Sequence, residues 1–139
     1  MPMGPREVLA RMQQQWLDPI EDDMWAEDVV VETPFALPGR PRRVEGRATI
    51  QAMAAAGRAA MPIRFEECTN VAIHETKDPE VIVVEYELAG IVAGRRASAP
   101  FIGVLQVRDG KVVRWREYQD AIAIASGLGT LPQLLTELS

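Results

Sequence analysis

The sequence is poor in the residues that build disulfides and metal sites. Its 139 residues include one cysteine, Cys68, and one histidine, His74. A single cysteine excludes an intrachain disulfide and a cysteine-built zinc site. Without a cluster of Cys and His residues we expect no transition-metal site, and no motif indicates another cofactor. The scarcity of cysteine favours a reducing, cytoplasmic setting.

Long hydrophobic runs are also missing. No stretch has the length needed to cross a bilayer, and the first residues, MPMGPREVLA, lack an apolar core, so we expect neither a membrane partner nor a secretory signal. The short GLG at 127–129 follows the last predicted strand without a helix-opening pattern, which argues against a phosphate loop.

Positive charge is in deficit as well. The chain carries 15 basic and 20 acidic residues, a net charge of −5, which argues against nucleic acid as the main partner. The one basic stretch, GRPRRVEGR at 39–47, is interleaved with Pro and Gly and is interpreted as a solvated loop rather than an anion site.

What is present is typical of a globular domain, with 47% hydrophobic and 25% charged residues. The length predicts one domain over residues 1–139, which buries about two thirds of the surface of the unfolded chain.

The N-terminal half predicts two helices and one short strand. Residues 5–17 form a helical stripe of Val8, Leu9, Met12 and Trp16. The segment EDVVVETPF at 27–35 predicts a brief strand. A second helix is expected at about 48–60, ended by Pro62. Its apolar face comprises Ile50, Met53, Ala54, Gly57 and Met61.

From residue 63 the hydrophobic period changes to two. The side chains of residues 63–74 alternate between two faces of a predicted strand. One face carries Ile63, Phe65, Val71 and Ile73, and the other carries Cys68 and His74. Further strands are expected at VIVVEYEL, SAPFIGVLQV and KVVRWREYQD, with AGIVAGRR as a connection and Asp109-Gly110 as a tight hairpin. Ser126 is interpreted as a turn residue.

This order of elements predicts an α+β fold. Four consecutive strands cannot make a doubly wound parallel sheet, which needs a helix after each strand. A curved, mostly antiparallel sheet wrapped around helices satisfies the order and leaves a cone-shaped pocket between sheet and helices, as in a cystatin-like α+β barrel. The Leu-rich tail after Leu128 is expected to dock on the domain or on a second subunit.

The stretch RWREYQD in the last strand contains the main candidate residue. Alternation places Val113, Trp115, Glu117 and Gln119 on one face, so a carboxylate sits in an apolar set. Desolvation favours the uncharged form of a carboxyl group, which suits Glu117 to accept and return a proton. The alternative is a structural glutamate paired with an arginine from a neighbouring strand or from a dimer partner.

Other candidates lie on neighbouring strands. Tyr86 shares a face with Ile82, Val84 and Leu88, so its hydroxyl either donates to a substrate carbonyl or is satisfied within the core. Phe101 and Gly103 are expected to face inward, and Gly103 either leaves room for a ligand or marks a sheet kink.

Three further residues have alternative roles. Trp16 and Trp25 either cap the cavity or belong to the core, and Met53 belongs to the core or to the pocket wall. His74 is expected to be solvent-exposed.

The chain resembles the nuclear transport factor 2-like superfamily, in its SnoaL-like, ketosteroid-isomerase-related branch. FIGVLQVRDGKVVRWREYQD is similar to the last two strands of limonene epoxide hydrolases. IHETKDPEVIVVEYELAG and REYQDAIAIASGLGTLP look still more like the phenazine-biosynthesis A/B proteins. EDVVVETPF followed by VEGRATI matches the general superfamily pattern. The resemblance implies the fold, and it places Thr33 and Phe35 at the pocket mouth.

The residue-by-residue match is uneven. Glu117 falls where the epoxide hydrolases have an essential aspartate and the phenazine proteins their acid–base glutamate. The hydrolases' arginine and second aspartate align with Val84 and Tyr86, and the phenazine proteins' helix histidine aligns with Met53. The isomerases' general base aligns with Thr33, and their oxyanion-hole acid falls at Gly103 or its neighbour. The resemblance therefore disfavours epoxide hydrolysis and steroid isomerisation by those routes.

Three hypotheses follow for the function. The first is a cofactor-independent isomerase, cyclase or dehydration catalyst acting on a hydrophobic carbonyl compound, with Glu117 as acid–base group and Tyr86 or a backbone N–H polarising the carbonyl. The second is a binding protein for a hydrophobic small molecule, and the third is a structural dimer module. The superfamily resemblance also implies a homodimer paired through the convex sheet face, which carries Glu85, Glu87, Arg114 and Arg116.

Overall fold

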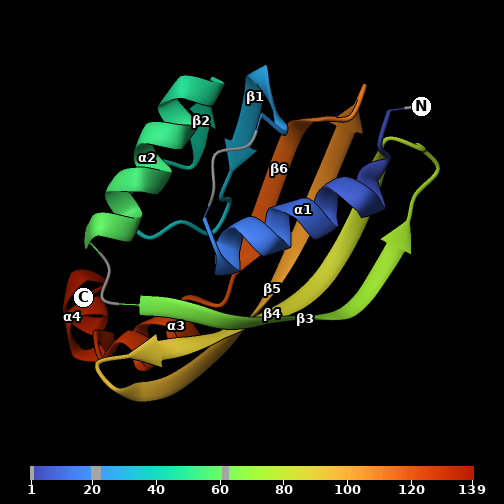
Figure 1. The fold of residues 1–139 in the computed structure, drawn as a ribbon. Helices are drawn as coiled ribbons and strands as arrows, with labels where there is room; N and C mark the ends of the chain where they lie inside the picture. The colour runs from blue at the N-terminus through green and yellow to red at the C-terminus, as the bar shows by residue number, and fades with distance from the viewer. Residues whose placement is uncertain (1, 20–22, 61–62) are drawn as a thin grey trace.

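A computed structural model describes residues 2–19, 23–60 and 63–139 of the chain. Over these residues one mixed sheet is packed against helices, which confirms the predicted α+β fold (Figure 1). The helices are α1 (Pro5–Leu17), α2 (Arg47–Ala60), α3 (Ala121–Leu128) and α4 (Leu131–Glu137). The strands are β1 (Trp25–Glu32), β2 (Arg43–Glu45), β3 (Ile63–Glu75), β4 (Val81–Val92), β5 (Arg95–Arg108) and β6 (Lys111–Gln119).

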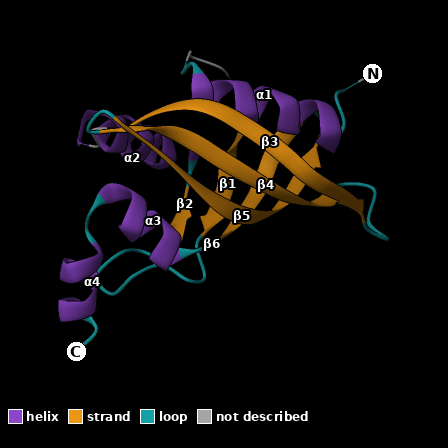
Figure 2. Cartoon of the chain, turned by 90° about the horizontal axis from the view of Figure 1, so that it is seen from below, coloured by secondary structure: helices purple, strands orange, loops and turns teal. Residues whose placement is uncertain are grey.

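The sheet is curved and mostly antiparallel, as predicted (Figure 2). Its strand order is β2-β1-β6-β5-β4-β3, and only β1 and β6 pair in parallel. The three-residue β2 was not predicted, because it lies in a Pro- and Gly-rich stretch and its extended form depends on pairing with β1.

Helix α1 covers the inner face of the sheet, where the core lies. The predicted stripe is confirmed, since Val8, Leu9 and Met12 are at most 1% exposed. The helix packs across β3, β4 and β5 (Figure 1). Burial of each such side chain contributes roughly 1.5–3 kcal/mol, which makes this stripe the main attachment of the helix to the sheet.

Helix α2 is bound much less tightly. It contacts β1 and β2, yet none of its side chains is buried, and Met53 is 45% exposed. Its predicted apolar face is therefore mostly open. The expected helix end at Met61 and Pro62 lies outside the described residues.

Two tight turns join the long strands. Asp109 (φ 53°) and Gly110 (φ 74°) confirm the predicted hairpin between β5 and β6. Ala93 (φ 49°) and Gly94 (φ 78°) form a turn of the same kind between β4 and β5, so the predicted longer connection at AGIVAGRR is wrong. Two successive residues with positive φ match the right-handed twist of the flanking strands.

A bulge in β6 corrects the predicted face of this strand. Gln106 pairs with Arg114 and Val107 with Val112, which leaves Val113 as an extra residue. Val112 is consequently the buried residue, at 0% exposed, and Val113 lies on the outer face of the sheet. Trp115 and Glu117, beyond the bulge, share the inner face as predicted.

Bulges also break the predicted alternation of β3. The register shifts between Phe65 and Glu67, and again between Asn70 and Ala72. Cys68 therefore packs against the core, whereas Val71 is 64% exposed. Simple alternation, which assumes no bulge, predicts the reverse. Each inserted residue moves the residues that follow it to the opposite face of the sheet.

The chain after β6 forms two helices that were not predicted. The Asp120 side chain accepts a hydrogen bond of 2.9 Å from the Ala123 amide and so caps α3. Ser126 lies within this helix and not in a turn. In the tail Leu134 is 5% exposed, whereas Leu135 is 59% exposed, so the expected docking on the domain holds for part of the tail only. No helix of the described segments is long and apolar enough to span a bilayer.

Candidate functional site

An aromatic cluster occupies the inner face of the sheet beneath α1. The ring of Tyr86, from β4, stacks on Phe101 of β5 with centroids 5.2 Å apart. Its other side stacks on Trp16 of α1, also at 5.2 Å. Trp115 of β6 lies against Trp16 at 5.7 Å. The strand register and the α1 stripe bring these four residues together, as alternation predicted.

Glu117 lies at the edge of this cluster and accepts hydrogen bonds from three neutral donors. The Tyr86 hydroxyl donates to its Oε2 at 2.7 Å, and Trp115 Nε1 donates to the same oxygen at 3.3 Å. Gln119 Nε2 donates to Oε1 at 2.8 Å. The Glu117 side chain is half-buried, so its carboxylate is in contact with the cluster without being sealed inside it.

No cation of the described chain pairs with Glu117. The ion pairs of the structure involve other carboxylates, such as Glu32, whose Oε1 lies 2.6 Å from Arg114 Nη2. Pairing with an arginine of a neighbouring strand is therefore wrong for the described residues, and pairing with an arginine of a dimer partner stays a prediction. Neutral donors fix the carboxylate in place without neutralising it.

The Tyr86 hydroxyl is committed to Glu117. Tyr86 is 1% exposed, and burial, followed by the nearby Glu117 carboxylate, raises its pKa well above the usual range of a tyrosine. The hydroxyl therefore stays protonated and keeps donating. In this structure Tyr86 positions Glu117, and its donation to a substrate carbonyl stays a prediction.

Gly103 makes room for a side chain of the protein itself. It pairs with Glu117 across β5 and β6, and the indole of Trp115 lies over it. A Cβ at this position would come within 2.1 Å of Trp115 Cη2. The space that Gly103 was expected to leave for a ligand is thus filled by Trp115, which is held with its Nε1 toward Glu117.

Other predicted site residues lie further from the carboxylate. Val84 is a fully buried core residue beside Gly103 in the register. Thr33 follows the last residue of β1, and its amide donates to the Arg42 carbonyl at 2.9 Å. Phe35 is 61% exposed and packs edge-on against Tyr118 on the outer face. The ligand contacts expected of these three residues, and of Met53 on the open helix α2, stay predictions.

His74 and Trp25 complete the predicted set. His74 is exposed, as expected, and its Nε2 lies 2.7 Å from Glu85 Oε2. Trp25 packs against the core cluster, and it also lines a hollow on the outer face.

Gln119 is the site residue that sequence reasoning did not select. The sequence signal was available, because Glu117 and Gln119 are two apart on one strand and so share a face. What could not be read from the sequence was that the amide turns back along the strand to the carboxylate instead of pointing into solvent.

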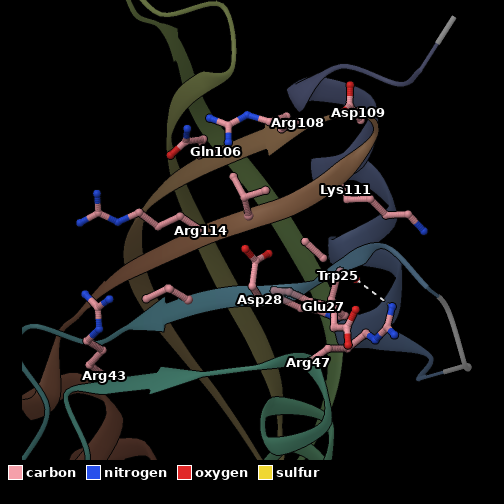
Figure 3. Close-up of a pocket in the computed structure, with 13 residues that line it drawn as sticks. Trp25, Glu27, Asp28, Arg43, Arg47, Gln106, Arg108, Asp109, Lys111 and Arg114 are labelled. Carbon is pink, nitrogen blue, oxygen red and sulfur yellow. Dashed lines mark hydrogen bonds between the residues drawn. The ribbon is translucent and has the colours of Figure 1, made fainter.

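A separate hollow of about 740 Å³ opens on the other face of the sheet (Figure 3). Asp28 lies near its centre, and basic side chains surround it (Figure 3). These are Arg43, Arg47, Arg108, Lys111 and Arg114. They are bound within the chain to acidic side chains or, for Arg47, to the Trp25 carbonyl at 3.4 Å. The hollow is polar and charge-paired, unlike the inner face.

Comparison with known proteins agrees with this fold. The sequence model of the SnoaL-like domain family matches residues 6–115. An uncharacterized PhzA/B-like protein of Pseudomonas aeruginosa is 32% identical over 109 residues, which are 77% of this chain and 75% of the relative.

Two solved structures show the similarity in three dimensions. A Bacillus subtilis protein described as a candidate isomerase superimposes with a TM-score of 0.79 at 25% identity, over 90% of this chain and 92% of that one. A candidate polyketide cyclase of Pseudomonas putida gives a TM-score of 0.70 at 15% identity, over 90% and 98% of the two chains. The second likeness is one of fold alone.

Proposed function

The chain belongs to the SnoaL-like domain family, and on this premise we propose that it is a small enzyme that moves a proton on a hydrophobic, carbonyl-containing molecule. The reaction would be an isomerisation, cyclisation or dehydration of the kind suggested by the names of its relatives, with Glu117 as the acid–base group. No cofactor is needed for such a proton transfer.

The observation that carries this proposal is the placement of Glu117. A half-buried carboxylate beside an aromatic cluster, held by neutral donors and no cation, has the arrangement expected of a general base. A carboxylate that only stabilises the fold is more often satisfied by a charged partner, as Glu32 is by Arg114.

The proton transfer balances with one carboxylate. Glu117 takes a proton from the carbon next to a carbonyl, and the electron pair of the C–H bond moves into the enolate. The same carboxyl group returns the proton to another carbon of the enolate in an isomerisation, or to a leaving hydroxyl, which departs as water, in a dehydration. In a cyclisation the enolate carbon bonds to a second carbonyl carbon, and the oxygen of that carbonyl takes the proton. Tyr86 and Trp115 hold Glu117 in one orientation throughout, which preserves the geometry between the two steps.

The proposal is tested by isotope exchange on α-tetralone, a bicyclic apolar ketone. In D2O the wild-type chain should accelerate deuterium incorporation next to the carbonyl, measured by proton NMR. Glu117→Gln should reduce the catalysed exchange by at least about a hundredfold, as expected for loss of a general base. Glu66→Gln, which alters an exposed carboxylate of β3, serves as the control and should exchange like wild type.

The same experiment separates the other two hypotheses. Saturable binding of α-tetralone without catalysed exchange would favour the binding protein. No exchange and no rise of the melting temperature with this ketone or with other apolar ketones would favour the structural module. Either result contradicts the catalytic role of Glu117.

We also propose that the chain forms a homodimer through the outer face of the sheet. Of the residues expected to pair there, Glu85 is bound to His74 and Arg114 to Glu32 within the chain. Arg116 has no carboxylate partner among the described residues, and its guanidinium lies 5.5 Å from the centre of the Tyr118 ring. A carboxylate such as Glu87 of a second copy would pair with this charge. Light scattering at micromolar concentration should give the mass of two chains, and the mass of one would contradict the proposal.

A further inference from the structure

The two oxygens of the Glu117 carboxylate are held differently. Oε2 accepts from Tyr86 at 2.7 Å and from Trp115 at 3.3 Å, so both of its lone-pair directions are occupied. Oε1 accepts from Gln119 Nε2 at 2.8 Å, its one donor among the described residues. A ligand donor that approaches this carboxylate is therefore better placed on Oε1, where it competes with a single half-buried amide.

The donors to the two oxygens also differ in freedom. Tyr86 is 1% exposed between two stacked rings, and Trp115 is 4% exposed against Gly103. Gln119 is the last residue of β6 and is half-buried. Its amide ends a flexible side chain with three rotatable bonds before the terminal group, and it can leave Oε1 without disturbing the aromatic packing.

We propose that Gln119 is a specificity-determining residue whose amide occupies Oε1 of Glu117 in the empty site and is displaced by a ligand that brings its own hydrogen-bond donor. This inference rests on the proposed role of Glu117 and assigns Oε1 as the oxygen that meets the substrate. The ligands favoured by such a contact are planar aromatic compounds with a hydroxyl or enol group. A flat ring can pack against Phe101, the half-buried cross-strand neighbour of Gln119, and the hydroxyl replaces the N–H of Gln119.

The proposal explains why a neutral amide stands beside the carboxylate. An arginine or lysine there would form an ion pair with Glu117, and a ligand hydroxyl would have to break it. A hydrogen bond from a neutral amide is weaker than an ion pair, and a ligand hydroxyl that donates to the same oxygen replaces it in kind. Gln119 thus keeps Oε1 hydrogen-bonded, and a ligand displaces it at a lower cost than it would displace a cation. An apolar molecule lacks the donor needed to compensate for that displacement.

The test uses 2-naphthol and naphthalene as matched probes, because they differ in one hydroxyl group. In ¹⁵N-labelled wild-type protein, 2-naphthol should shift the side-chain NH2 resonances of Gln119, which are assigned by their loss in Gln119→Leu. The Trp115 indole N–H should remain hydrogen-bonded and move less. Naphthalene should leave the Gln119 pair in place.

Affinity gives a second measurement. Gln119→Leu removes the competing donor, so 2-naphthol should bind at least about tenfold more tightly, the factor expected for one hydrogen bond to a charged group. Binding of naphthalene should change less than twofold. Gln106→Leu is the matched control, since Gln106 Nε2 donates to Glu80 Oε1 at 3.1 Å on the outer face. This variant should bind both probes like wild type.

The outcomes separate this inference from the proposed function. Unmoved Gln119 resonances in the presence of bound 2-naphthol would overturn the role of Gln119, and so would a loss of binding in Gln119→Leu or a failure of wild type to prefer 2-naphthol. None of these results bears on the α-tetralone exchange, which tests Glu117 alone. Displacement of Gln119 together with absent exchange would support this inference and leave Glu117 as a binding residue.

Discussion

The two faces of β6 use their polar side chains in opposite ways. On the inner face, Glu117 is held by a tyrosine, a tryptophan and a glutamine within an aromatic cluster. On the outer face, Arg114 binds Glu32 in an open, charged hollow. The inner arrangement holds one carboxylate in a single geometry with no cationic partner among the described residues, whereas the outer one pairs opposite charges at the surface. This difference is the ground on which we propose Glu117 as the acid–base group.

The strongest test of the inner face is Gly103→Ala. The added Cβ would meet Trp115 Cη2 at 2.1 Å, so the indole or the strand must move. We expect a loss of about 3 kcal/mol in the free energy of unfolding, at the upper end for overpacking of a core. Urea unfolding measures the loss, and a decrease in tryptophan ordering should accompany it in near-UV circular dichroism.

The neighbouring residue is a matched control for this change. Ile102 precedes Gly103 on β5, points to the other face and is 44% exposed. Ile102→Ala should cost less than about 1 kcal/mol, because its side chain is only partly removed from water. Equal losses in the two variants would mean that the inner face is not the more tightly packed of the two.

A smaller effect is expected when one donor to Glu117 is removed. Tyr86→Phe keeps the stacked ring but leaves Glu117 Oε2 with Trp115 alone. We expect a loss of about 1.5–2 kcal/mol, the typical contribution of a hydrogen bond to a charged group. Tyr118→Phe, on the outer face, should cost less than about 0.5 kcal/mol. Thermal unfolding of both variants measures the difference. Similar melting temperatures would mean that the Tyr86 hydrogen bond to Glu117 contributes no more than the Tyr118 hydroxyl does.

The raised pKa of Tyr86 predicts how stability changes in alkali. In the unfolded chain this tyrosine ionises near its ordinary pKa of about 10, whereas in the folded chain burial keeps it protonated. Its contribution is complete below pH 10 and declines as pH rises, because the folded state then binds more protons than the unfolded state. The limiting slope is about 1.4 kcal/mol per pH unit. Urea unfolding between pH 9 and 11 should show a shallower decline for Tyr86→Phe, and parallel curves would exclude the effect.

The smallest effect is expected on the outer face. Glu32→Gln removes the charge that faces Arg114 at 2.6 Å, at a Glu32 side chain 16% exposed. We expect a loss of about 1 kcal/mol or less that shrinks in 1 M salt, as for other ion pairs near a surface. The loss in Tyr86→Phe should not depend on salt in this way. A salt-independent cost at Glu32 would indicate that the outer pair is buried more deeply than the hollow suggests.

Much of this architecture follows from periodicity alone. Residue spacing predicts three of its features. These are the apolar stripe on α1, the inward set Phe101, Gly103 and Leu105 on β5, and the shared face of Trp115 and Glu117. Each of these segments keeps one hydrophobic period without interruption. The bulges at Val113 and in β3 were missed, because an inserted residue leaves the composition of a strand unchanged while it exchanges the faces.

The sequence by itself determined that one carboxylate, Glu117, shares a strand face with Trp115 and Gln119. Only the tertiary structure decided what surrounds it. Tyr86 lies 31 positions away in the chain and reaches Glu117 through the register of β4, β5 and β6. Trp115 occupies the space over Gly103 because the two strands are neighbours. Spacing along a strand determines the face to which each side chain points. Hydrogen bonds between side chains of distant strands depend instead on the strand register, which only packing of the whole sheet sets.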